Sequence, residues 1–324
     1  MENDISLLIT LPVLIVGLTA LVWSADKFVE GGASIAHHCG VSSLIIGLTV
    51  ISIGTSAPEI FVSANAALDQ SSGLAVGNAL GSNLANVGLV LGITALITPV
   101  AITRGIVKTE VPIMLGVTLL AGYVLHDAHL GRWESLALLA CLVLFIFFLI
   151  AKSRNGSADE GAEGGVALAE LSLKKAIVVT IVGLVILILS SKALVWSATE
   201  MAQKFGVSDL VIGITIVAVG TSLPELAASL AGALKGHSEM AVGNVIGSNI
   251  FNLLAVLPVA GVIYPTVIDD VDFLRDYGSV LLVSMILGAA CLWKTRNSAT
   301  GVLGRPLALI LLTTYVGYYC WLLL

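Results

Sequence analysis

The chain alternates between long apolar segments and short polar connectors. Ten apolar runs fall at residues 5–24, 41–68, 74–98, 110–126, 133–151, 176–200, 207–234, 240–264, 277–293 and 305–324. A helix that spans a bilayer needs about 20 apolar residues, and about 17 suffice when polar side chains at its ends reach the interface. The pattern therefore predicts an all-α membrane protein with ten transmembrane helices.

Composition supports this prediction and excludes other classes. Of the 324 residues, 57% are apolar and 11% are charged, whereas soluble domains contain about 45–50% apolar and about 25% charged residues. The net charge of −6 gives no reason to expect a nucleic-acid partner. The four cysteines are isolated from one another in the sequence, which argues against a disulfide framework or a zinc site. We expect no cofactor.

The distribution of basic residues predicts the orientation of the chain. With both termini outside, 11 of the 15 Lys and Arg residues fall on the cytoplasmic side, three fall outside, and Lys192 lies within a span. Cytoplasmic connectors collect Lys and Arg. We therefore expect a multi-pass protein of the cell membrane, surrounded by lipid, with both termini outside.

The second half of the chain repeats the first. Gly47–Asn86 aligns without a gap on Gly213–Asn252, and 19 of these 40 positions are identical. The polar segment 152–173 separates a first repeat, 1–151, from a second, 174–324, and we interpret it as a flexible cytoplasmic linker. Its acidic residues lack the spacing of an EF-hand calcium loop.

The two repeats are predicted to have opposite orientations in the membrane. Their equivalent segments begin in spans two and seven, so five crossings separate them, and an odd number reverses the direction. The charges agree, because Asp69, expected outside, aligns with Lys235, expected inside. Asp26 and Lys192 also align, and we expect local pairing or interfacial positions for both. Inverted repeats are typical of secondary transporters, with substrate sites near the midplane.

Each repeat carries a glutamate in the middle of a span. The sequences GTSAPE (54–59) and GTSLPE (220–225) place Glu59 and Glu225 near mid-depth, where a charged side chain is costly and needs a partner. Neither has a basic residue within two helical turns, so the expected partner is a cation or a proton. Pro58 and Pro224 remove backbone donors, which predicts breaks in helices two and seven and frees nearby carbonyl oxygens.

A second repeated motif, GNxxGSNxxN, lies in spans three and eight. Its glycines form small-xxx-small faces that permit close helix packing. Within each copy the serine and the last asparagine share a helix face and can add oxygens to the glutamate site; these are Ser82 with Asn86, and Ser248 with Asn252. The other asparagines are either site residues or structural hydrogen-bond partners.

The donor set favours a hard divalent cation. Two ionised glutamates supply a charge of −2, and Ca²⁺ accepts 6–8 oxygens in flexible geometry, whereas Mg²⁺ demands a tight octahedron. No soft-ligand group of Cys or His accompanies the glutamates, which disfavours zinc and copper. An intramembrane hydrolase with Ser56 or Ser222 as nucleophile would need a nearby base, and none is close in sequence. A passive cation channel is a further alternative, although inverted duplication favours a transporter.

At these two motifs the chain closely resembles the calcium/cation antiporter superfamily, and within it the prokaryotic sodium/calcium exchanger branch. The resemblance covers essentially the whole chain. It implies exchange of Ca²⁺ for Na⁺ by alternating access, with spans one and six sliding over a core of spans two, three, seven and eight. A calcium/proton antiporter of the same fold is the alternative, although its GNxxE pattern differs from GTSxPE. We expect a monomer.

The resemblance also implies roles for individual residues. Ca²⁺ would be bound by the two glutamates and by backbone carbonyls of Thr55 and Thr221. The surroundings of the Na⁺ sites match Ser52, Ser56, Ser82, Ala218, Ser222 and Ser248. Asn86 and Asn252 match the central polar pair. Some relatives have an aspartate where this chain has Asn252, which argues against K⁺ co-transport here.

Overall fold

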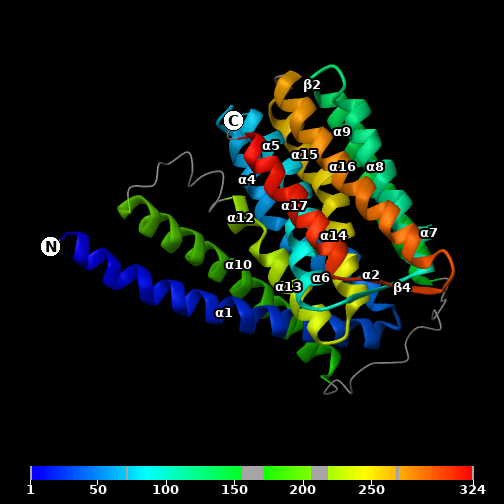
Figure 1. Ribbon diagram of the computed structural model, residues 1–324, viewed down its shortest axis with the longest axis horizontal. Coiled ribbons are helices and arrows are strands. Elements are labelled where there is room, and N and C mark those ends of the chain that lie inside the picture. Colours follow the sequence, from blue (N-terminus) through cyan, green and yellow to red (C-terminus); the bar gives the residue numbers. More distant parts are fainter. Residues whose placement is uncertain (1, 71, 155–170, 206–217, 268–269, 323–324) are drawn as a thin grey trace.

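The computed structural model describes residues 2–70, 72–154, 171–205, 218–267 and 270–322 (Figure 1). The helices of the first half are α1 (Glu2–Cys39), α2 (Ser43–Ile46), α3 (Ser52–Thr55), α4 (Ala57–Leu68), α5 (Ser72–Ala85), α6 (Gly92–Ile97), α7 (Arg104–Lys108), α8 (Glu110–Val124) and α9 (Arg132–Arg154). Those of the second half are α10 (Leu173–Lys204), α12 (Ala218–Thr221), α13 (Leu223–Leu234), α14 (Ser238–Phe251), α15 (Leu257–Ile263), α16 (Asp270–Thr295) and α17 (Arg305–Leu322).

Most of the predicted spans are present as long apolar helices. Within the described residues, seven helices are long and apolar enough to cross a membrane, and the bent pair Ser43–Thr55 and Ala57–Leu68 makes an eighth. The runs 207–234 and 305–324 contain the shorter helices α13 and α17, and the beginning of the former lies outside the described residues. The total of ten spans therefore stays a prediction.

The first helix is longer than the apolar run that predicted it. The run ends at residue 24, yet α1 continues to Cys39. The polar residues that end the run satisfy one another on the helix, because the Nζ atom of Lys27 lies 2.6 Å from a carboxylate oxygen of Glu30, three residues later. Residues three apart are neighbours on a helix surface, so hydropathy alone misplaced the end of this span.

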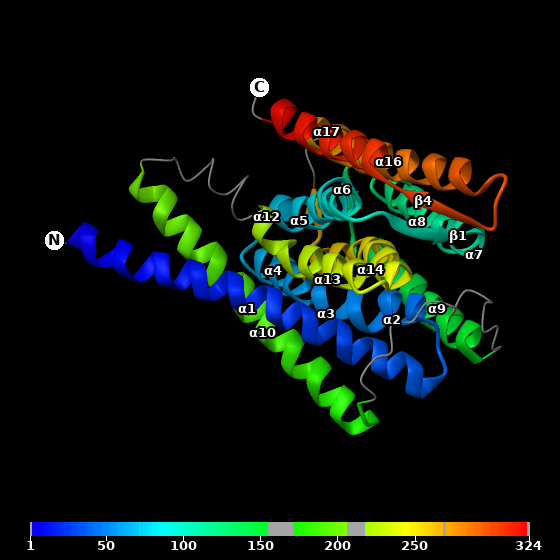
Figure 2. The ribbon, with the colours of Figure 1, turned by 60° about the horizontal axis from the view of Figure 1, so that its bottom comes forward.

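Helices α1 and α10 form a closely packed pair. They lie together along one side of the molecule, with α16 and α17 on the opposite side and α4, α5, α13 and α14 between them (Figure 2). Glycines on both helices permit their close approach in one region of the contact. A Cβ atom on Gly31 would lie 2.4 Å from the Thr180 hydroxyl oxygen, and one on Gly183 would lie 2.8 Å from the Phe28 nitrogen.

The centre of the fold is α14, whose residues from Met240 to Phe251 are all buried. The predicted close packing is confirmed for its two motif glycines, but it is wrong for Gly77 and Gly81 of α5, where an added Cβ atom would have no neighbour within 4 Å. A Cβ atom on Gly247 would lie 2.6 Å from Ser52 Oγ, and one on Gly243 would lie 2.6 Å from the Leu44 carbonyl oxygen. These contacts hold α14 against the helical segment that leads to the Gly54–Glu59 motif.

Two short antiparallel ladders join the halves of the chain. Strand β1 (Val100–Thr103) pairs with β4 (Thr300–Leu303), and β2 (His129–Leu130) pairs with β3 (Thr266–Val267). The alignment of the repeats places the beginning of β1 on β3, so equivalent connectors form the two ladders. Each ladder joins a connector of one repeat to a connector of the other.

Candidate ion-binding site

The two proline motifs have the same backbone conformation. Helix α3 ends at Thr55, Ser56 has φ −83° and ψ 2°, and α4 begins at the next residue; the two helical segments meet at 41°. In the second half, Ser222 has φ −89° and ψ 3° between α12 and α13. Each proline lies in the first helical turn, where its missing N–H is tolerated. Both motifs therefore begin a new helix.

The two glutamates lie in the first turns of these new helices. Glu59 in α4 is 1% exposed and Glu225 in α13 is 2% exposed. The amino-terminal end of a helix is partially positive and stabilises a carboxylate. The two side chains are close enough for their charges to interact, and Ser56 Oγ donates to Glu225 Oε1 at 3.3 Å. The motifs of both repeats thus meet at one place.

The carboxylates lack a basic partner in the described part of the chain. No described Lys, Arg or His side chain forms an ion pair with either glutamate. The Oε2 atoms of both also have no hydrogen-bond partner among the described residues. A buried carboxylate without a partner is strongly unfavourable. The arrangement therefore requires a cation or protons at this place.

One asparagine in each repeat holds a glutamate in position. Asn78 Nδ2 donates to the Glu59 carbonyl oxygen at 3.1 Å and to Ser63 Oγ at 2.9 Å. Its equivalent, Asn244, donates to the Glu225 carbonyl oxygen at 3.3 Å and to a serine hydroxyl at 2.8 Å. The sequence left these asparagines between two roles, and the structure shows a structural one that both repeats share.

The other hydroxyl groups of the first motif lie beside the break. Thr55 is buried and its Oγ1 donates to the Ile51 carbonyl oxygen at 3.1 Å and approaches Asn244 Oδ1 at 3.3 Å. Ser52 is buried and donates to the backbone of the preceding turn. In the second motif Thr221 is half-buried at the end of α12. Ala218 begins this helix, and its side chain lies outside the described residues.

The predicted central asparagines begin equivalent π-helical segments. Asn86 opens η2 (Asn86–Leu91) and Asn252 opens η4 (Asn252–Val256), both buried. Short π-helical segments are frequent at functional sites. Hydropathy and motif spacing gave no signal for them, because the residues that follow each asparagine are all apolar, so a change in helical period shifts no apolar stripe.

Several buried polar atoms of the predicted site have no protein partner. Ser82 and Ser248 are buried with the two asparagines. Among the described residues, atoms without a hydrogen-bond partner include Ser222 Oγ, Ser248 Oγ, Asn86 Nδ2, and Asn252 Nδ2 and Oδ1. Each such atom costs about 1–3 kcal/mol unless water or an ion satisfies it. The segments that begin with the two asparagines pack against the glutamate helices, η4 against α4 and η2 against α13, so these atoms indicate a hydrated or ion-filled site.

One contact of the site was missed by sequence reasoning. Ser191 Oγ of α10 donates to the Gly220 carbonyl oxygen at 2.9 Å, the carbonyl that Pro224 deprives of its helical donor. The equivalent position in α1 is Ala25, which has no hydroxyl. The two breaks are therefore supported differently, and no local motif around Ser191 indicates this role.

The ligand chemistry is that of oxygen. No group of three or more His, Cys, Asp or Glu side chains is clustered within the described residues. The buried polar groups of the two motifs are two carboxylates with hydroxyl and amide groups. Oxygen ligands suit Na⁺-like and Ca²⁺-like hard cations rather than Zn²⁺ or Cu²⁺.

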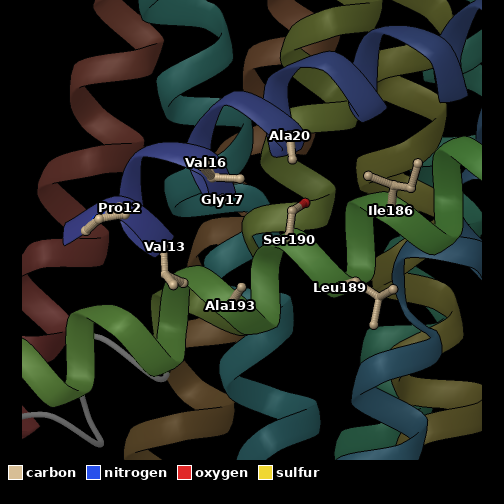
Figure 3. A pocket seen from close by; sticks show the side chains of 9 residues that line it. All are labelled: Pro12, Val13, Val16, Gly17, Ala20, Ile186, Leu189, Ser190 and Ala193. Atoms are coloured by element: carbon tan, nitrogen blue, oxygen red, sulfur yellow. The ribbon is translucent and has the colours of Figure 1, made fainter. Parts of the chain in front are cut away.

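An apolar groove lies apart from this site. It runs between α1 and α10 (Figure 3) and is lined by Pro12, Val13, Val16, Gly17, Ala20, Ile186, Leu189, Ser190 and Ala193. Its polar member, Ser190, donates to the Leu187 carbonyl oxygen of its own helix. The groove therefore offers no charge to an ion.

Comparison with known proteins assigns the chain to a family. The model of the sodium/calcium exchanger protein family matches residues 9–151 and 175–324, which is nearly the whole chain. The chain belongs to this family. It is a multi-pass membrane protein of a transporter family rather than an enzyme, as the sequence predicted.

Relatives of this exchanger family align over most of their lengths. The chain is 44% identical to the putative antiporter CaxA of Alkalimonas amylolytica, covering 94% of this chain and 95% of CaxA. It is 31% identical to the sodium/calcium exchanger MaX1 of Methanosarcina acetivorans, covering 85% and 89%. A structure of the sodium-calcium exchanger NCX_Mj soaked with 2.5 mM Na⁺ and 0.1 mM Ca²⁺ superposes with a TM-score of 0.81 at 32% identity, covering 96% and 97%.

Proposed function

We propose that the protein is a secondary antiporter that exchanges Ca²⁺ for Na⁺ by alternating access, and that it expels Ca²⁺ with the inward Na⁺ gradient. The observation that carries this proposal is the meeting of Glu59 and Glu225 from two halves of the chain, buried and without a basic partner in the described residues. Membership of the exchanger family supports it.

Charge balance explains why the two ions would compete. The two ionised glutamates supply −2, which one Ca²⁺ neutralises, whereas Na⁺ neutralises it only when more than one ion binds. Buried charge that is left uncompensated is costly, so the loaded states are those in which the sum is close to zero. Because Ca²⁺ and Na⁺ use the same carboxylates, occupation by one excludes the other, which is the requirement for exchange.

We assign the ligands as the repeats suggest. Ca²⁺ would be held by Glu59, Glu225 and the backbone carbonyls of Thr55 and Thr221, which adjoin the two breaks. Na⁺ and its central polar shell would use the surrounding groups, namely Ser52, Ser56, Ser82, Asn86, Ala218, Ser222, Ser248 and Asn252. The unpartnered atoms at four of these positions support the assignment.

Two inverted five-helix repeats, 1–151 and 174–324, form the proposed frame of this site. Three observations support inversion: equivalent connectors form the two ladders, Asn78 and Asn244 make the same contacts, and Asn83 Nδ2 donates at 3.2 Å to the carbonyl of its own equivalent, Asn249. A residue that contacts its equivalent lies near an approximate two-fold axis. Inverted repeats place transporter substrates at such an axis.

Exchange can be tested in vesicles containing the purified protein. Vesicles loaded with Na⁺ should accumulate radioactive Ca²⁺ when external Na⁺ is replaced by choline, and external Na⁺ should inhibit this uptake. Vesicles without Na⁺ but with an imposed pH gradient provide the second arm. Equal uptake driven by the pH gradient alone would identify a calcium/proton antiporter, and Ca²⁺ flux without any counter-ion would indicate a channel.

A further inference from the structure

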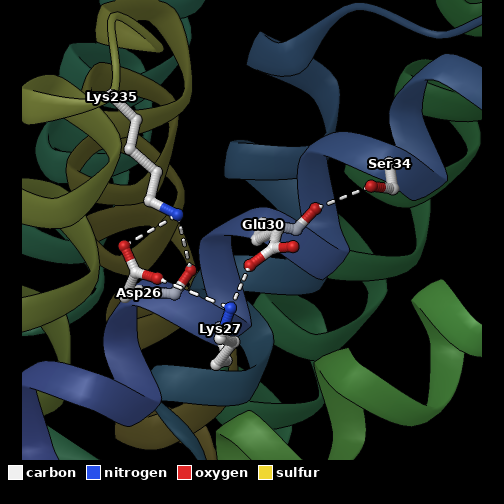
Figure 4. A network of polar contacts seen from close by, with 5 residues as sticks. All are labelled: Asp26, Lys27, Glu30, Ser34 and Lys235. Atoms are coloured by element: carbon white, nitrogen blue, oxygen red, sulfur yellow. Dashed lines mark hydrogen bonds and ion pairs between the residues drawn. The ribbon is translucent and has the colours of Figure 1, made fainter. Parts of the chain in front are cut away.

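An ion pair ties α1 to the second repeat at the end of α13. Lys235 Nζ lies 2.7 Å from Asp26 Oδ1 and also donates to the Asp26 carbonyl oxygen at 3.2 Å. Figure 4 shows the lysine reaching across to α1 from the turn that follows α13. The Asp26 side chain is 44% exposed and the Lys235 side chain is 26% exposed, so water can solvate both groups when the contact opens.

The neighbouring charges belong to α1 itself. Lys27 Nζ lies 2.6 Å from Glu30 Oε2 and 3.9 Å from Asp26 Oδ2, and the hydroxyl of Ser34 donates to the Glu30 carbonyl oxygen. These contacts connect residues of one helix (Figure 4). In this network the Asp26–Lys235 pair is therefore the contact that joins two elements.

The repeat gives this pair a counterpart with its charges exchanged. The alignment that pairs Glu59 with Glu225 also pairs Asp26 with Lys192, and Asp69 with Lys235. The counterpart of the pair between Asp26 on α1 and Lys235 after α13 is therefore a pair between Lys192 on α10 and Asp69 after α4. Because both signs change together, the second pair would attract as the first does.

The second pair is not formed in the structure. Lys192 Nζ lies 5.6 Å from the centroid of the Phe61 ring, and Phe61 precedes Asp69 by eight residues on α4, about 12 Å along the helix axis. Among the described residues, neither Lys192 nor Asp69 forms an ion pair. A cation–π contact compensates an intramembrane lysine only partly. Asp69, which follows α4, would therefore compensate the charge of Lys192 better than the Phe61 ring that Lys192 contacts here.

Helix packing shows the same difference between the halves. Helix α1 packs along α13, whereas α10 makes no comparable contact with α4 over the described lengths of these helices. Helices α1 and α13 are packed together and joined by the ion pair, whereas α10 and α4 are not packed in this way and their ion pair is not formed. The two halves thus have equivalent sequences in different arrangements.

We propose that Asp26–Lys235 and Lys192–Asp69 are alternative latches of the transport cycle, each formed in one of its two end states and open in the other. The proposal rests on the alternating access proposed above. In the predicted topology the formed latch is cytoplasmic, so this structure has the cytoplasmic side closed. If each half adopted the arrangement that the other has here, the Asp26–Lys235 latch would open. Lys192 would then move along α4 until it reached Asp69.

Cross-linking tests both latches directly. Two double-cysteine variants, D26C/K235C and K192C/D69C, are made in a chain whose four native cysteines are replaced, and treated with a short cross-linker that reductant removes. We expect peptide mass spectrometry to find both cross-links in separate samples. When the four introduced cysteines are combined in one chain, we expect each molecule to form one of the two cross-links but not both. Each link should stop Ca²⁺ uptake, and reductant should restore it.

A second measurement uses charge rather than cysteine at the first latch. In the K192C/D69C variant, D26N should increase the cross-linking rate by up to about fivefold, the range expected for a half-exposed ion pair. The matched control is E30Q, which removes a carboxylate one turn away on the same helix without breaking the contact to Lys235. It should leave the rate unchanged.

Several results would overturn the latches. They fail when K192C/D69C is never cross-linked in a protein that exchanges ions, when both links form in one molecule, or when E30Q changes the rate as D26N does. Cross-linking is read by mass and not by flux. A protein that shows alternating links but no Na⁺-dependent Ca²⁺ uptake therefore contradicts the proposed function and leaves the latches supported.

Discussion

Replacing Glu59 or Glu225 by glutamine retains the shape of the side chain and removes one of the two charges proposed to bind Ca²⁺. Both carboxylates are buried, at 1% and 2% exposure, so bulk water cannot replace the lost charge. Removing one member of a buried charge pair costs about 3–5 kcal/mol. We therefore expect E59Q and E225Q each to weaken Ca²⁺ binding by about two to four orders of magnitude.

Thermal unfolding measures this loss independently of transport. A ligand present at 100 times its Kd stabilises a protein by about 2.7 kcal/mol, so Ca²⁺ should raise the Tm of the unmodified protein. At the same Ca²⁺ concentration, neither variant should show the shift, and Na⁺-driven uptake in vesicles should be lost. Without ions the variants should unfold no earlier than the parent, because an uncompensated buried charge has been removed.

Glu110 offers a matched control. It is 1% exposed, as buried as Glu59, but it forms an ion pair with Lys152. The E110Q variant should retain the Ca²⁺-dependent shift in Tm although its stability without ions decreases. A full Ca²⁺ response in E59Q and E225Q would refute the assignment of the site, as would an equal loss of response in all three variants.

Two further predictions concern the packing that supports the site. G247A should lower the free energy of unfolding by about 1–3 kcal/mol, because its Cβ would lie 2.6 Å from Ser52 Oγ. The control is G116A at an exposed helical glycine, which should be neutral or slightly stabilising. Urea unfolding of both variants in detergent checks this prediction. S191A should lower the free energy of unfolding by about 1–3 kcal/mol, because it leaves the buried Gly220 carbonyl unpaired. An unchanged free energy of unfolding in the same urea measurement would contradict this prediction.

The sequence was informative where a strong physical constraint acts on each residue separately. A bilayer excludes unpaired polar groups, so apolar runs predicted the long helices, and the glutamates within those runs were candidate site residues. Repetition then brought Glu59 and Glu225 together without any knowledge of contacts. The structure agrees that they meet, from α4 and α13.

Other features depend on contacts between distant residues and could not be predicted. The β ladders pair segments that lie far apart along the chain, such as Val100 with Leu303. Their strands have only two to four residues, too few for an alternation of apolar and polar residues to predict them. The support of Gly220 by Ser191 comes from a different helix. The end of α1 was predicted too early because hydropathy counts Lys27 and Glu30 as polar, although they neutralise each other on the helix.

The differences between the two halves bear on the energetics of transport. Ser56 donates to Glu225, whereas the equivalent hydroxyl oxygen, Ser222 Oγ, has no partner among the described residues. The proposed latches show a similar difference between the halves, because Asp26 of the first repeat contacts Lys235 of the second, whereas the equivalent contact between Lys192 and Asp69 is not formed. If the halves exchange arrangements, a contact broken in one half is made by its equivalent in the other wherever both halves have matching residues, as at Ser56 and Ser222. The two end states then differ by only a few interactions, so the free energy of binding one Ca²⁺ or several Na⁺ ions is not consumed in driving the change between them.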